Sequence, residues 1–155
     1  MSLIAKRPVV DNQPPNGSIE QLDTATLAEI VSGLAIADEL WRPHVAHDRN
    51  ERARIRLMAT PIYEVWLLGW TPGQSVGLHD HGRANGAFIV VDGTLTETLA
   101  HEPGDRRSPA LTNRTLTIAD VAVIEAGEVH DVANRSTALA TSIHAYSKPL
   151  RAMNF

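Results

Sequence analysis

From Tyr63 onward the chain is a succession of short apolar segments separated by turn residues. YEVWLLGW is followed by Thr-Pro-Gly, and GAFIVVDG ends in an Asp-Gly hairpin signal before TLTETLA. Four further segments of this kind follow: LTNRTLTI, DVAVIEAG, VHDVANRS and ALATSIHAY. About eight short strands without helices between them predict a small antiparallel barrel or a jelly roll of two sheets. A closed barrel of this size can enclose one small ligand.

The region before the strands has a different pattern. Residues 1–18 are rich in proline and are expected to form an extended or mobile arm. A helical segment is predicted over residues 19–47, beginning at a cap provided by Ser18 or by Asp23. Its apolar stripe is expected to be interrupted at Gly33 and to pack against the outside of the sheet.

The composition limits the kinds of partner. With 155 residues, the chain is expected to form one domain over residues 1–155, with the barrel over residues 52–147. A net charge of -4 argues against a nucleic-acid partner or an anionic membrane surface. No run approaches the ~18 apolar residues of a membrane span. The first residues lack the apolar core of a secretory signal, so none is expected. Cysteine is absent, so a disulfide framework is excluded, and a cytoplasmic location is expected. The sequence leaves the oligomeric state open, with a monomer favoured.

Two histidines, His79 and His81, stand one residue apart in the stretch GQSVGLHDHGRANGAFIVVDG. In an extended strand both imidazoles would lie on one face, with Asp80 on the other. Neutral imidazole is a good ligand for zinc, iron, copper and nickel. The pair therefore indicates half of a metal site.

Two segments resemble the conserved motifs of the cupin superfamily. The first contains the histidine pair between Gly73 and Gly93; the second, AGEVHDVAN, contains His130. The resemblance implies that His130 completes the metal site. Asn85 and Gly86 occupy the positions where the first motif has its glutamate. The implied ligand set is thus three imidazoles without a protein carboxylate. Such a set excludes the common iron site of two histidines and one carboxylate, and three histidines can also bind zinc.

The last expected strand carries a second polar set. Ser142, His144 and Tyr146 alternate in TSIHAYS and therefore project from one face. The serine can bond one ring nitrogen of the histidine, and the tyrosine hydroxyl can meet the other, which would fix the tautomer. An ordinary half-polar barrel strand is the alternative interpretation.

Together these segments resemble the cysteine dioxygenase family of thiol dioxygenases, from about Arg54 to Leu150. The resemblance implies a cupin-type barrel that oxidises a small thiol with O2 to its sulfinate. It also implies Fe(II) as the cofactor and assigns the site residues: His79, His81 and His130 as ligands, and Tyr146, His144 and Ser142 as the relay beside them. L-cysteine is the favoured substrate, and 3-mercaptopropionate is the alternative.

In this family an arginine before the first barrel strand holds the substrate carboxylate, and its place falls on Arg54. If the segment is extended, Arg52 and Arg56 share its face and could share the role. A solvated edge strand would explain the same pattern without any ligand.

Two departures from the family pattern are present. Gly86 stands where animal members have a cysteine cross-linked to the active-site tyrosine, so an unmodified Tyr146 is expected. Lys148 replaces a proline after Ser147, and a trans peptide bond is expected there because a non-proline cis bond is costly. Functions of other classes remain open: a non-catalytic metal-binding cupin sensor, or a zinc- or manganese-dependent isomerase or hydrolase. The remaining histidines are expected at the surface: His44, His47 and His101.

Overall fold

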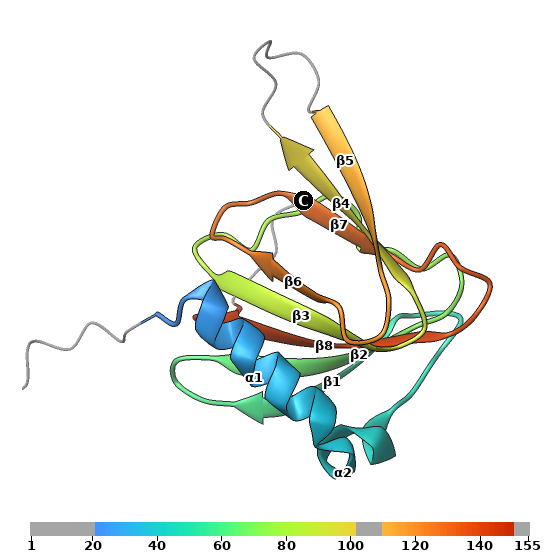
Figure 1. Cartoon of the computed structure of the whole chain (residues 1–155), viewed down its shortest axis with the longest axis horizontal. Coiled ribbons are helices and arrows are strands. Elements are labelled where there is room, and N and C mark those ends of the chain that lie inside the picture. Colours follow the sequence, from blue (N-terminus) through green and yellow to red (C-terminus); the bar gives the residue numbers. More distant parts are fainter. Residues whose placement is uncertain (1–20, 102–109, 151–155) are drawn as a thin grey trace, which may run out of the picture.

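The structure is a computed structural model that describes residues 21–101 and 110–150 (Figure 1). In these residues eight strands form two antiparallel sheets. The five-stranded sheet has the order β1-β2-β8-β3-β6, and the three-stranded sheet has the order β5-β4-β7. The bounds are β1 Ala53–Ala59, β2 Glu64–Trp70, β3 Asn85–Asp92, β4 Leu95–His101, β5 Ala110–Leu116, β6 Val121–Ile124, β7 His130–Ala133 and β8 Ala140–Ser147. This arrangement confirms the jelly roll.

The N-terminal helices cover the five-stranded sheet. Helix α1 spans Thr24–Ile36, and α2 spans Asp38–Trp41, followed by the 3-10 turn η1 over Arg42–His44. Asp23 caps α1, since its Oδ1 accepts from the backbone N–H of Thr26 at 2.8 Å. The arm predicted over residues 1–18, and the alternative cap Ser18, lie outside the described residues.

The predicted interruption of the helix at Gly33 is wrong, because α1 continues through it. A glycine in a helix costs about 1 kcal/mol relative to alanine. The helix gains more from burying Leu27 and Val31, both with no exposed surface, against the sheet. Figure 1 shows α1 lying across the outer face of this sheet.

Apolar residues of β2 alternate between two cores. Val65 and Leu67 pack toward α1, while Leu68 and Trp70 face the space between the two sheets. The inner core also contains Phe88 of β3. Because both faces of the large sheet are covered, polar side chains on the inner face of β2 and β8 are shielded from water. Ser142, His144 and Tyr146 of β8 lie on this inner face.

The extended strand expected at the histidine pair is not present, because this segment is irregular. His79 forms an isolated antiparallel bridge with His130, and its backbone N–H donates to the carbonyl of His130 at 2.9 Å. Gly77 and Gly82 flank the pair with φ of 87° and 61°. These left-handed conformations favour glycine and bend the chain on both sides of the pair. Convergence of the imidazoles therefore results from a bent loop held against β7.

The expected trans bond after Ser147 is also wrong, because the Ser147–Lys148 peptide bond is cis. Ser147 itself is fully buried. Its hydroxyl donates to the carbonyl of Ile62 at 2.6 Å and accepts from the N–H of Leu22 at 2.9 Å. These contacts position the end of β8 against the start of the chain's described part.

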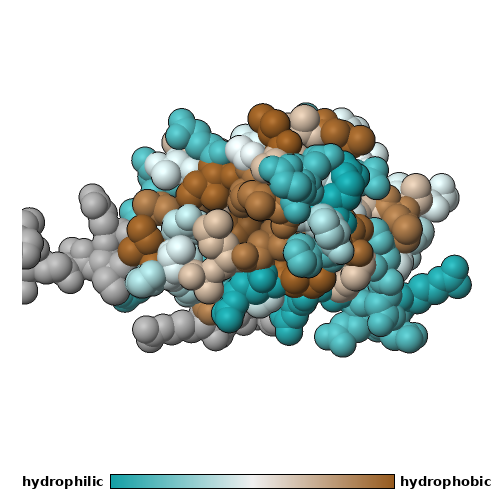
Figure 2. All heavy atoms as spheres, turned by 90° about the horizontal axis from the view of Figure 1, so that it is seen from below, coloured by the Kyte–Doolittle hydropathy of each residue, from teal (hydrophilic) through white to brown (hydrophobic). Residues whose placement is uncertain are grey.

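The surface is mixed. Seen from below, hydrophobic residues gather in the middle of the molecule and hydrophilic residues border them (Figure 2). Large exposed apolar side chains include Ile36, Leu40 and Met58. Exposed apolar residues are common on folded proteins, so they do not by themselves indicate a partner. None of the helices in residues 21–101 and 110–150 is long and apolar enough to cross a membrane.

Candidate active site

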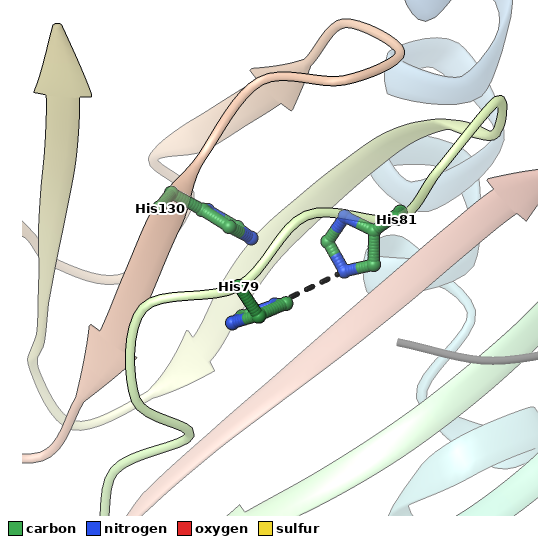
Figure 3. Close-up of side chains that lie close together, drawn as sticks. All are labelled: His79, His81 and His130. Atoms are coloured by element: carbon green, nitrogen blue, oxygen red, sulfur yellow. Dashed lines mark hydrogen bonds between the residues drawn. The ribbon is translucent and has the colours of Figure 1, made fainter. Parts of the chain in front are cut away.

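Three histidines converge inside the jelly roll: His79 and His81 from the β2–β3 loop and His130 from the start of β7 (Figure 3). Each is at most 4% exposed. One ligand nitrogen from each lies within 4.8 Å of the others, and the Nε2 atoms of His79 and His81 are 3.2 Å apart. The sequence prediction that these residues meet agrees with this geometry.

The donor set fits a metal ion. Nε2 of His130 and Nδ1 of His81 are buried and have no hydrogen-bond partner in the described residues. Burying a polar atom without a partner costs about 1–3 kcal/mol, so such atoms in a native fold require an explanation. A metal bound between converging imidazoles provides one for the nitrogen of His130, and three imidazoles suit iron and zinc alike.

Burial keeps the imidazoles of His79 and His81 neutral. Desolvation lowers the pKa of His81 to about 3, with the neighbouring histidines adding to the effect. Desolvation also lowers the pKa of His79, against a hydrogen bond to the Gly77 carbonyl that raises it. Because a metal ligand must be deprotonated, both rings are ready to bind an ion at neutral pH.

The tautomers of two ligands follow from their partners. Nδ1 of His79 lies 2.7 Å from the carbonyl oxygen of Gly77, which can only accept. Nδ1 of His130 lies 2.9 Å from a carboxylate oxygen of Glu97. Both rings therefore carry the proton on Nδ1 and offer the lone pair of Nε2 to the site.

The predicted relay is present on β8, and it has one more member. The hydroxyl of Ser142 lies 2.7 Å from Nε2 of His144, and Nδ1 of His144 lies 3.2 Å from the Tyr146 hydroxyl. At the other end, the indole N–H of Trp70 donates to Ser142 Oγ at 2.9 Å. Phe88 stacks on the His144 ring with a centroid separation of 4.7 Å and an interplanar angle of 7°.

The contact with Trp70 favours one direction for the relay. An indole N–H can only donate, so Ser142 accepts from Trp70, and its own hydroxyl proton can be donated to Nε2 of His144. Burial lowers the pKa of His144 well below its usual value, so the ring is neutral. When Ser142 donates to Nε2, the ring carries its proton on Nδ1 and donates it to the Tyr146 oxygen. In this tautomer the hydroxyl proton of Tyr146 points into the pocket.

Tyr146 lies next to the histidine triad. Its ring centroid is 4.8 Å from that of His81. Burial raises the pKa of Tyr146, an effect that the nearby Arg52 opposes, so the phenol stays protonated at neutral pH. On the adjacent β3, Gly86 pairs with Tyr146, and a side chain at this glycine would place Cβ 3.1 Å from the ring. The glycine therefore makes room for the phenol beside the metal ligands.

A pocket of about 250 Å³ opens onto the triad and the relay. Its lining includes His79, His130, His144, Tyr146, Arg52 and Arg54. Of the three arginines predicted to share a face, Arg52 and Arg54 line this pocket. Arg52 precedes β1, and within the strand Arg54 pairs with Leu68 and Arg56 with Trp66 of β2.

The three arginines differ in depth. Arg52 is half-buried, with its guanidinium carbon 4.8 Å from the centroid of the Trp70 ring and its Nε buried without a partner in the described residues. Desolvation lowers the pKa of Arg52, whereas Tyr146 raises it. Arg54 is exposed where it lines the pocket, and Arg56 lies over Trp66 at 5.7 Å. Of these three arginines, Arg52 is therefore the one that an anionic partner would stabilise most.

Residues 19–155 match the family model of cysteine dioxygenase type I. The chain belongs to this family. The match covers both the triad and the relay, and a cupin-type metal-dependent enzyme is what the family and the fold support.

Solved structures share the fold of this cysteine dioxygenase family member at low sequence identity. A double-stranded β-helix protein from Klebsiella pneumoniae aligns with a TM-score of 0.59 and 20% identity, over 74% of this chain and 93% of that one. A Thermus thermophilus protein aligns with a TM-score of 0.57 and 18% identity, over 70% of this chain and 93% of that one. A cupin superfamily protein from Desulfitobacterium hafniense aligns with a TM-score of 0.55 and 14% identity, over 68% of this chain and 85% of that one. At these identities the likeness shows the cupin fold alone.

Two residues of the site were not predicted from the sequence. Trp70 was expected only as part of a strand, and Glu97 only as part of the segment LTETLA. Both act through hydrogen bonds to residues far away along the chain. The alternation of β2 could have indicated Trp70, since it shares the inner face with other pocket residues.

The other histidines lie outside the site. His44 and His101 are exposed, as predicted. His47 is half-buried, and its Nε2 lies 2.9 Å from the carbonyl oxygen of Ala140. The surface prediction for His47 is therefore wrong, because this ring anchors the segment before β1 to the start of β8.

Proposed function

We propose that this protein is a non-haem iron dioxygenase that oxidises a small thiol carboxylate, L-cysteine in the first place, to the sulfinate. The observation that carries the proposal is a pocket at three convergent imidazoles, lined by two of them, by Tyr146 and by the half-buried Arg52. A ferrous ion bound by the imidazoles would supply the redox chemistry with O2 and the positive charge that deprotonates a coordinating thiol. In the overall reaction one thiol and one O2 give one sulfinic acid, so no further reductant is required.

The substrate carboxylate is bound by arginine. Resemblance to the family assigns this role to Arg54, which lines the outer part of the pocket. Arg52 lies deeper, and its buried Nε has no partner in the described part of the chain. A charge-assisted pair is stronger where water is excluded. We therefore assign Arg52 as the main anchor and place Arg54 at the pocket mouth.

Glu64 supports a substrate that carries an ammonium group. It is 4% exposed and lines the same pocket, where its Oε1 accepts from the backbone N–H of Leu150 at 2.8 Å. A pocket with arginines and one carboxylate complements an amino acid better than a simple acid. This favours L-cysteine over 3-mercaptopropionate, which lacks the amine.

Tyr146 is the proton donor of the site. Its hydroxyl accepts from His144, so its own proton is available to the substrate or to O2. The raised pKa keeps the phenol protonated throughout the neutral range. Ser142 and Trp70 hold His144 in this orientation through their hydrogen bonds; Trp70 also lines the pocket, whereas Ser142 does not. All of these residues belong to one chain, and the proposed reaction needs no second subunit.

The deciding experiment measures O2 uptake and sulfinate formation by the iron-loaded protein with three thiols. L-cysteine and 3-mercaptopropionate should be oxidised with one O2 consumed per sulfinate, and L-cysteine should have the higher kcat/KM. Cysteamine, which lacks a carboxylate, should be a poor substrate. Iron-loaded protein that consumes no O2 with any of the three would contradict the proposal and favour the sensor or hydrolase alternatives.

Arg52→Ala is expected to lower kcat/KM for both thiol acids by roughly ten- to 150-fold. This corresponds to about 1.5–3 kcal/mol, the value of one charged hydrogen-bonded pair that persists in the transition state. Arg54→Ala should have a smaller effect because Arg54 is exposed and screened by solvent. Steady-state kinetics on both variants with both acids measures the difference.

Two controls accompany this comparison. Cysteamine oxidation should be nearly unaffected by either variant, since it offers no carboxylate. Arg56→Ala removes an arginine from the same strand face, stacked on Trp66, and should leave the kinetics unchanged. A larger loss in Arg54→Ala than in Arg52→Ala would move the anchor to the residue that the family pattern indicates.

A further inference from the structure

A carboxylate is buried directly behind one ligand of the candidate metal centre. Glu97 of β4 has no exposed surface. Its Oε1 lies 2.9 Å from Nδ1 of His130, and its Oε2 accepts from Nε of Arg114 at 2.6 Å. Arg114 lies opposite Glu97 in the β4–β5 register, and its side chain is 43% exposed. A chain of contacts therefore runs from the metal ligand through a buried acid to a surface arginine.

The cost of burying this acid makes the arrangement informative. An ionised carboxylate inside a protein is strongly destabilising unless it is paired and hydrogen-bonded. Here both oxygens have partners, one on each side. Arg114 is always protonated and donates to Oε2, so Oε1 of Glu97 is placed to accept from the Nδ1–H of His130. The Nε2 lone pair of His130 consequently faces the site, where this atom has no protein partner among the described residues.

The three ligands are supported in different ways. His79 is oriented by the carbonyl of Gly77, a neutral acceptor. Nδ1 of His81 has no partner in the described part of the chain. His130 is bonded to a carboxylate, which increases the basicity of the imidazole as a ligand. The candidate centre thus has a carboxylate hydrogen-bonded to one of its ligands. The glutamate that would bind the metal directly in the cupin motif is replaced by Asn85 or Gly86.

We propose that Glu97 is a positioning residue that holds His130 in the metal-binding tautomer and strengthens its bond to the ion, with Arg114 holding Glu97 in place. The inference rests on the proposed metal centre but not on the substrate or the reaction. It predicts that the ligand set behaves as three unequal imidazoles, with His130 the strongest donor.

The test is the metal affinity of Glu97→Gln, measured by anaerobic titration of the apoprotein with Co(II) and with Fe(II). Glutamine keeps an acceptor of similar size but loses the charge and turns an amide N–H toward one of the two donors. We expect metal binding about 10–100-fold weaker than in the wild type. Arg114→Ala should weaken binding by less than tenfold, and Arg114→Lys should restore part of the loss. The visible spectrum of the Co(II) protein should shift in Glu97→Gln.

Controls separate positioning from general destabilisation. Arg42→Ala breaks a different arginine–carboxylate pair, which Arg42 forms with Asp38 at the surface, outside the site. It should leave metal affinity unchanged. Thermal unfolding of each apoprotein shows whether the variants fold.

A second measurement needs no variant at all. The ¹⁵N chemical shifts of the wild-type apoprotein should show His130 protonated at Nδ1 and not at Nε2 at pH 7. Protonation at Nε2, or a folded Glu97→Gln with metal affinity within about twofold of the wild type, would overturn the proposal. Wild-type protein that binds metal tightly but oxidises no thiol would leave this inference standing and remove only the proposed function.

Discussion

Replacing His130 with alanine is expected to abolish stoichiometric iron binding and all turnover with thiols. The wild-type protein, purified with iron, should contain up to one ion per chain, because one nitrogen from each of three buried imidazoles converges on one point. Loss of one of only three protein ligands leaves two neutral donors, which is too few to compete for an exchangeable divalent ion. His79→Ala and His81→Ala should give the same result. Elemental analysis of the purified variants measures the occupancy.

The control for these variants is His101→Ala. His101 is exposed and lies 2.7 Å from the hydroxyl of Thr112, on the β4–β5 pair away from the triad. This variant should retain wild-type iron content and activity. Full iron occupancy in His130→Ala would show that the metal binds elsewhere, and the assignment of the centre would then fail.

Tyr146→Phe is expected to retain iron and substrate while lowering kcat by roughly 10²–10⁴-fold, the range for loss of a positioned proton donor. Phenylalanine preserves the ring beside His81 and above Gly86, so the pocket should keep its shape. Only the hydroxyl, which accepts from His144 and faces the pocket, is removed. Single-turnover kinetics at saturating thiol, with iron content measured in parallel, tests this expectation.

Ser142→Ala should have a smaller effect on kcat than Tyr146→Phe. Ser142 orients His144 and has no contact with the pocket contents, so its loss weakens the tautomer preference without removing the proton donor. If Tyr146→Phe turned over thiols at the wild-type rate, the hydrogen-bonded set on β8 would be ordinary packing. The dioxygenase proposal would then lose its main support.

The sequence pattern is sufficient to predict which side chains share a face when they lie within one strand. Ser142, His144 and Tyr146 alternate within one strand, so their common face followed directly from the strand repeat. His79 and His81 were assigned for a reason that proved incomplete, since they lie in a bent loop and not in a strand. Their convergence with His130 was nevertheless anticipated, because resemblance to the cupin motifs reflects the tertiary arrangement.

The remaining features depend on contacts between distant parts of the chain. Glu97 and His130 are 33 residues apart, and Trp70 and Ser142 are 72 apart, so no local pattern links them. The relative depth of the arginines likewise depends on which of them reaches Trp70. Helix α1 also depends on distant contacts. It continues through Gly33 because burial of its apolar residues against the sheet outweighs the low helix propensity of glycine.

The indole of Trp70 closes the relay at its inner end. This side chain has no exposed surface, and its N–H can donate a hydrogen bond but cannot accept a proton from Ser142 in return. The hydrogen-bonded set therefore ends at Trp70 and cannot pass a proton on through that residue to bulk water. A proton that leaves Tyr146 must therefore return through the pocket that this residue lines together with Arg52 and Arg54. A ligand that fills this pocket should consequently slow hydrogen–deuterium exchange of the Tyr146 hydroxyl.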